Sequence, residues 1–294
     1  MALLVNAVLT ENVNEVIRTE TDEDRLKFKI EELKQVCFEE VKAHPNDYDP
    51  RDVKALEADS ETGIMLFLES NDWKVEPALE AIRRHCSYRR ENGVLDLKVT
   101  DIPVEVHQTG LFMAKGFDKA GHPLFYIRLS VSPGPKEMHP LIIKQFLLNC
   151  ESVRNMVLEK NKKLAIIFDC RQAQVDIGLL REILDIYTQK YPPAAEYIAF
   201  LDMNFGFKMI LQIIKYFFPK YLWKKMIFID QEALKTMVDQ DNLPYYLDGK
   251  IEPLSKSEIS ECPNLADYAK ANNIKDKVYE KMKSHLDKQL SNDS

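Results

Sequence analysis

The chain has 294 residues, of which 45% are hydrophobic and 30% are charged, proportions that are ordinary for a soluble globular protein of one large or two smaller domains. Its 40 basic and 47 acidic residues leave a net charge of -7, which argues against general nucleic-acid binding because neutralising phosphates requires a basic face. The five cysteines are widely spaced and show no metal or redox motif, so reduced thiols in a cytosolic compartment are expected. No apolar run approaches the ~20 residues of a membrane span, and the opening MALLVNAVL lacks the basic leader of a secretory signal.

The first hundred residues are predicted to be helical. Residues 1–20 show little pattern and are expected to be loosely ordered, and residues 21–98 are predicted to form an all-helical unit. Apolar residues recur at helical spacing from Asp22 to His44, and Pro45 follows. Further helices are expected over 51–59, 63–72 and 73–93, with Gly93 as the stop of the last one.

The pattern then changes to alternating strands and helices over residues 99–250. Runs at 111–114 and 124–131 flank turn residues and predict a β-hairpin. The run LAIIFD at 164–169 predicts a central strand buried on both faces. Further strands at 196–202 and 225–230, with helices at 139–161, 178–191 and 231–240, predict a mixed α/β sheet covered by helices. The tail, 251–294, is charged, with a helix expected over 275–290.

Motifs for catalysis are missing from this α/β pattern. All nine glycines are isolated, so neither a dinucleotide-binding fingerprint nor a phosphate-binding loop is present, and no G-x-S-x-G elbow holds a nucleophilic serine. The six histidines include no i, i+4 pair that could bind zinc. Asp169 ends the buried strand, where an enzyme would often place an acid, but a capping or turning role is the alternative, and the next residues offer no partner. We therefore expect a binding protein with no catalytic residue, metal or cofactor.

An apolar and basic segment lies between Asp202 and Asp230. It contains no acidic residue and carries five lysines: Lys208, Lys215, Lys220, Lys224 and Lys225. Such a segment suits a surface that meets anionic lipid, with apolar groups in the acyl region and ammonium groups at the phosphates. The alternative is a buried helix and strand whose lysines reach out to solvent.

Several local motifs resemble those of the CRAL-TRIO (Sec14-like) lipid-transfer family over about residues 50–250. They are FLESNDWKVEPALEAI with Arg89, the hairpin GFDKAGHPLFYIR, the strand LAIIFDCRQ, the stretch IYTQKYPPAAEYIAFLDMNFGFKMILQIIKYFF and the closing DNLPYYLDGK. The chain departs from the family pattern at a few positions: His122, Pro193, Asp202, Asn204 and Asp248. The leader YDPRDVKAL with NDWKVEPAL resembles in particular the lipid-binding half of a larger member of the family.

The resemblance implies a CRAL-TRIO fold that holds one lipid in an apolar cavity beneath a movable gate helix, after an all-helical N-terminal unit. The gate segment is apolar on more than one face, so one face can line a cavity while another meets core or bilayer. The residues expected to form the gate and the cavity are Phe205, Phe207, Met209, Ile210, Leu211, Ile213, Ile214, Phe217 and Phe218.

The resemblance also implies a headgroup site. In members that bind phosphatidylinositol, a glutamate and a lysine engage the headgroup, and Glu182 and Lys215 match these positions. The alternative is that Lys215 reaches solvent and Glu182 lies on an exposed helix face. Members that exchange phosphatidylcholine carry hydroxyls near Leu164 and Ile166, so choline-lipid exchange is not expected. The predicted cargo is phosphatidylinositol or a related phospholipid, and a wholly apolar ligand such as a tocopherol, retinoid or sterol is the alternative.

The expected setting is cytoplasmic, with transient peripheral binding to anionic membranes. The residues expected to dock are Lys220, Tyr221, Trp223, Lys224 and Lys225. A lipid-regulated scaffold or adaptor that does not transfer its lipid is the competing hypothesis, in which the charged tail contacts a protein partner whose identity the sequence does not indicate.

Overall fold

The computed structural model describes residues 24–58, 61–192, 194–203, 211 and 220–291. The chain divides into two compact units, Met1–Glu91 and Asn92–Ser294, which we describe one at a time. The prediction for residues 1–20 lies outside the described residues, and the division into four segments stays a prediction.

The first unit is helical, as predicted. Its elements are a helix over 24–43, a short turn η1 (Pro45–Asp47) and the helices α2 (Pro50–Ala58), α3 (Glu61–Ser70) and α4 (Val75–Glu91). Leu33, Leu68 and Ile82 are fully buried in its apolar core. Asp52 on α2 and Arg89 on α4 are also buried and form an ion pair within this core. Burying one of these charges alone would be costly, so the pair fixes how α2 lies against α4.

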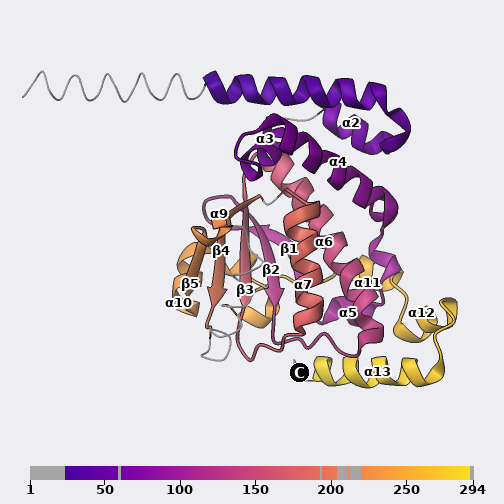
Figure 1. Cartoon of the computed structure of the whole chain (residues 1–294). Helices are drawn as coiled ribbons and strands as arrows, with labels where there is room; N and C mark the ends of the chain where they lie inside the picture. Colours follow the sequence, from indigo (N-terminus) through magenta and orange to yellow (C-terminus); the bar gives the residue numbers. More distant parts are fainter. Residues whose placement is uncertain (1–23, 59–60, 193, 204–210, 212–219, 292–294) are drawn as a thin grey trace, which may run out of the picture. The chain divides into compact units, whose positions relative to one another are not determined.

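The second unit is built on a mixed sheet with strand order β1-β2-β3-β4-β5 among the described residues (Figure 1). β1 and β2 form the predicted antiparallel hairpin, and β2 to β5 run parallel. The strands are β1 (Phe112–Phe117), β2 (Pro123–Arg128), β3 (Leu164–Asp169), β4 (Ala195–Leu201) and β5 (Met226–Ile229). The helices before and between them are α5 (Val104–Gln108), α6 (His139–Lys160), α7 (Ile177–Asp185), a π-helical turn η5 (Ile186–Lys190) and α9 (Lys220–Trp223), and α10 (Gln231–Met237) follows β5. The mixed α/β sheet flanked by helices is thus confirmed.

The two faces of this sheet are packed differently. Successive residues of a strand point to opposite faces, so Tyr126, Ile167 and Ala199 share one face, where Leu234 and Val238 of the α10 region complete a filled core. The other face is turned toward α6 and α7, which lie side by side in Figure 1. β3 is buried on both faces, as the run LAIIFD predicts.

The C-terminal segment packs on this same unit. It contains α11 (Lys256–Glu261), α12 (Leu265–Ala271) and α13 (Asp276–Ser291). His285 of α13 donates a hydrogen bond from Nε2 to the carbonyl of Ser132 at 3.0 Å, and Met282 and Leu286 are buried. The predicted helix over 275–290 is therefore present and amphipathic, whereas α11 and α12 were not predicted. No helix within the described ranges has the length and apolar character needed to cross a membrane.

The backbone of the closing segment DNLPYYLDGK (residues 241–250) explains why aspartate is tolerated at position 248, where the family pattern has glycine. Asp248 has a φ of 59°, a left-handed conformation that favours glycine but that aspartate tolerates. At Gly249 a Cβ atom would lie 1.9 Å from the carbonyl oxygen of Leu243, so a side chain there would displace the backbone. Glycine is thus required at position 249 because the backbone of Leu243 lies so close. At position 248 glycine would be favoured only by the left-handed dihedral angle.

We expect Gly249→Ala to lower the free energy of unfolding by about 3 kcal/mol or more, because the added methyl overpacks a backbone contact. The matched control is Gly93→Ala in the same unit, where φ is 61° but nothing lies within 4 Å of the added Cβ. That variant should lose only about 1–2 kcal/mol, the cost of the left-handed conformation. Urea denaturation of both variants measures the difference, and equal losses would contradict the close-approach argument.

Candidate functional site

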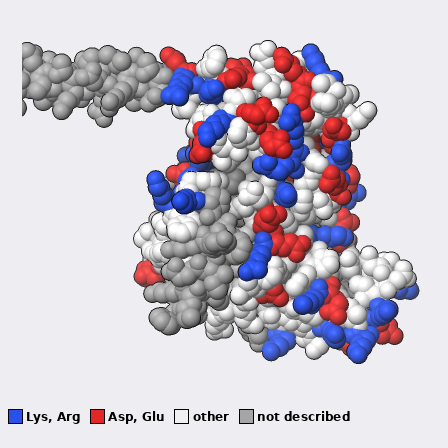
Figure 2. Space-filling view, in the orientation of Figure 1, with Lys and Arg blue, Asp and Glu red and all other residues white. Residues whose placement is uncertain are grey.

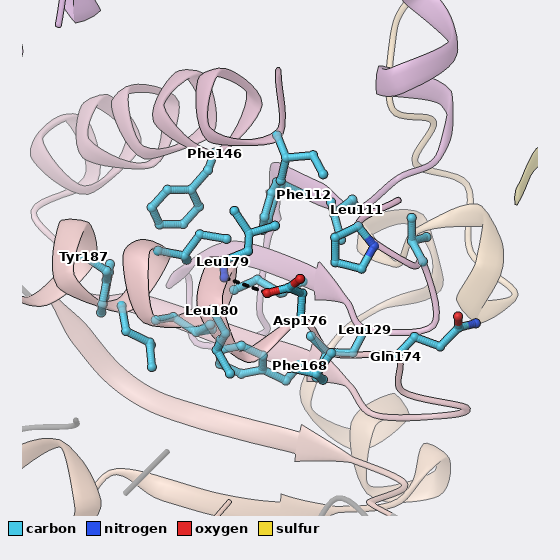
Figure 3. Close-up of a pocket in the computed structure, with 18 of the residues that line it drawn as sticks. Leu111, Phe112, Leu129, Phe146, Phe168, Gln174, Asp176, Leu179, Leu180 and Tyr187 are labelled. Carbon is cyan, nitrogen blue, oxygen red and sulfur yellow. Dashed lines mark hydrogen bonds between the residues drawn. The ribbon is translucent and has the colours of Figure 1, made fainter. Parts of the chain in front are cut away.

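A cavity lies between the sheet and the helices α6 and α7 (Figure 3). Its walls leave a volume of about 70 Å³ that the centre of a water-sized sphere can reach. In Figure 3, Phe146 extends from α6 and Leu180 from α7 toward the space above Phe168 of β3. Its walls come from the sheet (Phe112, Phe125, Ile127, Ile166, Phe168, Ile198), from α6 (Ile142, Phe146), from α7 and η5 (Leu179, Leu180, Ile183, Leu184, Tyr187), and from the loops (Leu111, Leu129, Val131, Pro133, Gln174, Val175, Asp176).

Helical periodicity directs one face of α7 into the cavity. Leu180, Ile183, Leu184 and Tyr187 are spaced i, i+3, i+4 and i+7, so they share a face. Asp176 starts the helix, and its Oδ1 accepts a hydrogen bond from the amide of Leu179 at 2.9 Å. This bond also holds the pKa of Asp176 below its usual range, so the carboxylate stays ionised as a cap.

The lining is almost entirely hydrocarbon. Among the described residues that form it, Asp176 is the charged side chain, and no lysine or arginine is present. Without a cation a phosphate or carboxylate has no partner there, and burying it unpaired would be strongly unfavourable. The cavity is therefore suited to acyl chains, rings or other apolar groups.

An aromatic ladder extends from the cavity floor to the edge of the sheet. Phe168 on β3 stacks on Phe200 on β4 with ring centroids 5.2 Å apart, and Phe200 stacks on Phe228 on β5 at 5.7 Å. Phe228 is 57% exposed. Sequence reasoning missed these residues, although each predicted strand carries a phenylalanine one or two residues before its terminal aspartate.

The structure describes only part of the predicted gate and headgroup residues. Leu211 is buried, whereas Lys215 and the other predicted gate residues (Phe205, Phe207, Met209, Ile210, Ile213, Ile214, Phe217, Phe218) lie outside the described residues. Glu182 is on α7 but is exposed and does not line the cavity. Its role stays a prediction.

The predicted docking residues lie on and directly after α9. Lys220, Trp223 and Lys224 are exposed, and Tyr221 is half-buried. Figure 2 shows basic side chains on the surface at the place that α9 occupies in Figure 1. Lys225 is half-buried, and its Nζ donates a hydrogen bond to the carbonyl of Ala195 on β4, so this lysine ties α9 to the sheet.

The carboxylate of Asp169 is bound by a neighbouring arginine. Its Oδ1 accepts hydrogen bonds from the amide and Nε of Arg171, and its Oδ2 accepts from Nη2 of the same arginine at 2.7 Å. Arg171 also donates to the carbonyl of Tyr246 at 3.0 Å. The carboxylate is thus fully engaged in joining β3 to the turn around Tyr246. No group of three His, Cys, Asp or Glu side chains in the described part of the chain could hold a metal ion.

Comparison with known proteins identifies the fold. Residues 107–249, which contain the sheet and most of the cavity wall, match the CRAL/TRIO domain. This part of the chain is a CRAL/TRIO domain. Among solved structures, the crystal structure of Sfh5 is similar with a TM-score of 0.60 and 14% sequence identity, covering 85% of this chain and 96% of that one. The family resemblance and the fold inferred from the motifs are confirmed, and the match to this domain supports lipid binding in general.

Filling the cavity should weaken binding of hydrophobic ligands. We expect Leu180→Trp to displace about three methylenes of a bound chain at about 0.8 kcal/mol each, which lowers affinity about 50-fold. Titration with a fluorescent fatty acyl probe measures the change. The matched control is Ile177→Trp on the same helix, where the side chain is exposed and does not line the cavity. Equal affinity in the two variants would show that the probe binds elsewhere.

Proposed function

We propose that this protein binds one lipid in the apolar cavity, phosphatidylinositol or a related phospholipid, and transfers or presents it between membranes through a movable gate helix within residues 205–218. The observation that carries the proposal is the hydrocarbon-lined cavity between the sheet and the helices α6 and α7. The acyl chains would occupy this cavity, and no bond would be made or broken.

The energetics of desorption explain why such a carrier is useful. A lipid with two chains has ~30 methylenes, and exposing each to water costs ~0.8 kcal/mol, so desorption through water faces a barrier on the order of 20 kcal/mol. Movement from a bilayer into a protein cavity exchanges one apolar environment for another and is nearly neutral. Shielding the chains is therefore sufficient for transfer.

The headgroup would lie at the cavity mouth, because the described lining offers it no cation. Lys215 is the proposed partner of a phosphate, and Glu182 is the second proposed headgroup residue. A wholly apolar cargo (a tocopherol, retinoid or sterol) is the second candidate, and the absence of a lysine or arginine from the described lining favours it. Both cargoes use the same hydrocarbon wall and differ in what they require at the mouth.

Native mass spectrometry of protein purified from cells, followed by lipid extraction, tests the cargo. Recovery of phosphatidylinositol, with its loss in Lys215→Ala, would support the phospholipid proposal, and recovery of a sterol or prenol would replace it. Lipid exchange between donor and acceptor vesicles then separates a carrier from a scaffold. Bound lipid without catalysed exchange would favour a lipid-regulated adaptor.

Docking is proposed to occur in the cytosol through α9 and the residues after it. The exposed Lys220 and Lys224 would contact anionic headgroups while Trp223, 40% exposed, enters the interface. Lys225 is assigned to the Ala195 carbonyl and is left out of the docking test.

The double variant Lys220→Glu and Lys224→Glu should bind vesicles containing phosphatidylserine at least about 30-fold more weakly, since each lysine near an anionic surface contributes about 1 kcal/mol and each glutamate adds repulsion. Vesicle sedimentation at physiological salt measures the loss. The charge-matched control, Lys270→Glu and Lys277→Glu on the exposed surface of α12 and α13, should bind like the unchanged protein. If both double variants weaken binding equally, net charge and not this surface governs docking.

A further inference from the structure

One buried polar atom in the cavity wall forms no hydrogen bond with the described residues. Tyr187 lines the cavity, its hydroxyl is buried, and this hydroxyl has no hydrogen-bond partner among the described residues. Buried tyrosine hydroxyls in proteins nearly always have a partner, because a buried unpaired polar group is destabilising. A phenylalanine would fill the same space without that penalty.

The neighbouring polar groups of the same segment are satisfied within the chain. Tyr191 donates its hydroxyl to Oε1 of Glu151 at 2.7 Å, and Thr188 donates its hydroxyl to the carbonyl of Leu184 at 2.7 Å. Tyr246 also has an unpaired buried hydroxyl, but its ring lies under Arg128, away from the cavity lining. Tyr187 therefore combines an unpaired hydroxyl with a position on the cavity wall.

The local backbone sets this position. Tyr187 is in η5, where α7 widens into a π-helical turn, and the amide of Tyr191 bonds to the carbonyl of Ile186 at 3.2 Å. Single π-turns of this kind occur frequently at functional sites. In Figure 3, Tyr187 lies at the opposite end of the labelled side chains from Gln174. Burial raises the pKa of Tyr187 well above its usual range, with smaller contributions from Tyr221 and Cys150, so the phenol stays neutral.

The chemistry of the wall limits what this hydroxyl can recognise. A neutral phenol in a hydrocarbon lining that has no described cation suits a neutral oxygen, since a phosphate or carboxylate would be buried without a counter-charge. In an acyl lipid the neutral oxygens next to the hydrocarbon are the ester carbonyls. One polar group in an apolar site is also the usual means of fixing the orientation of a ligand.

We propose that Tyr187 is a ligand-recognition residue whose hydroxyl donates a hydrogen bond to an ester carbonyl of the bound lipid. This inference rests on the proposed function and narrows it to lipids with ester-linked chains. The ester is held at the Tyr187 end of the cavity, and the acyl chains extend from there toward Leu129 and Gln174.

The test compares an ester-linked phospholipid with its ether-linked counterpart of the same headgroup and chain length, which lacks the carbonyl oxygens. Purified protein is loaded from vesicles that contain both lipids in equal amounts, and the bound ratio is measured by mass spectrometry. The unchanged protein should prefer the ester about tenfold, the fold-change expected from one buried hydrogen bond. Tyr187→Phe should take up both lipids without preference. Its thermal stability without lipid should be equal or higher, which a purely structural tyrosine would not show.

Tyr191→Phe is the matched control, at the residue that directly follows the π-helical turn. It loses the bond to Glu151 and should melt at a lower temperature while keeping the ester preference. Uptake of both lipids by the unchanged protein without preference, or an ester preference that survives in Tyr187→Phe, would overturn this inference and leave the carrier function standing. Failure of the unchanged protein to take up either lipid would overturn the carrier function and the inference together.

Discussion

The alternation of side chains along the parallel strands is the constraint on which the cavity depends. Phe125, Ile166 and Ile198 lie in register across β2, β3 and β4 and face the cavity, whereas their neighbours in sequence (Tyr126, Ile167, Ala199) face the filled core. A slip of one residue in any strand would exchange these two sets. The small side chains of Ala165 and Ala199 lie on the filled face, where they admit close packing, and the cavity face carries larger ones. One sheet thereby supports a dense core and a hollow on opposite faces.

The hollow persists because the helices above it rest on large side chains. Phe112, Phe125 and Phe146 form an aromatic cluster with ring centroids 5.3 to 6.2 Å apart between the sheet and α6. Protein interiors are normally packed without voids, so an open volume needs rigid groups around it that prevent collapse. Aromatic rings suit this purpose because they have few rotatable bonds. Such a wall would keep its shape during the proposed entry and exit of an apolar ligand.

Local periodicity was enough to predict the elements that surround the cavity. The strand 164–169 was predicted residue for residue, and α6 differs from the expected helix by one residue. Apolar runs, Pro192 and the hairpin turn are all signals that can be read from neighbouring residues in the sequence. Local signals do not predict contacts between residues that are far apart in the sequence. The ladder of Phe168, Phe200 and Phe228 depends on strand register, and the pair of Asp52 and Arg89 depends on how two helices cross.

The site was predicted less completely than the fold. The π-helical turn that positions Tyr187 follows α7 directly and spans only Ile186–Lys190, which is too short for a change in apolar spacing to be visible in the sequence. Lys225 looks like its neighbour Lys224 in the sequence, yet the structure gives it a backbone carbonyl as its partner. A lysine's surroundings depend on which strand lies beside it, and composition does not encode that.

The net charge of the chain and the lysines proposed to dock act over different distances. This difference explains how an acidic protein could bind an anionic membrane. The chain carries -7 overall, so at low salt such a surface would repel it weakly. At physiological salt, charges are screened beyond about 8 Å, and the acidic residues of distant elements then contribute little at the point of contact. Lys220 and Lys224 would act there, together with the exposed ring of Trp223 on the same short helix as Lys220. Attraction that is confined to contact favours brief and salt-sensitive binding, which suits the proposed transfer of lipid from one membrane to another.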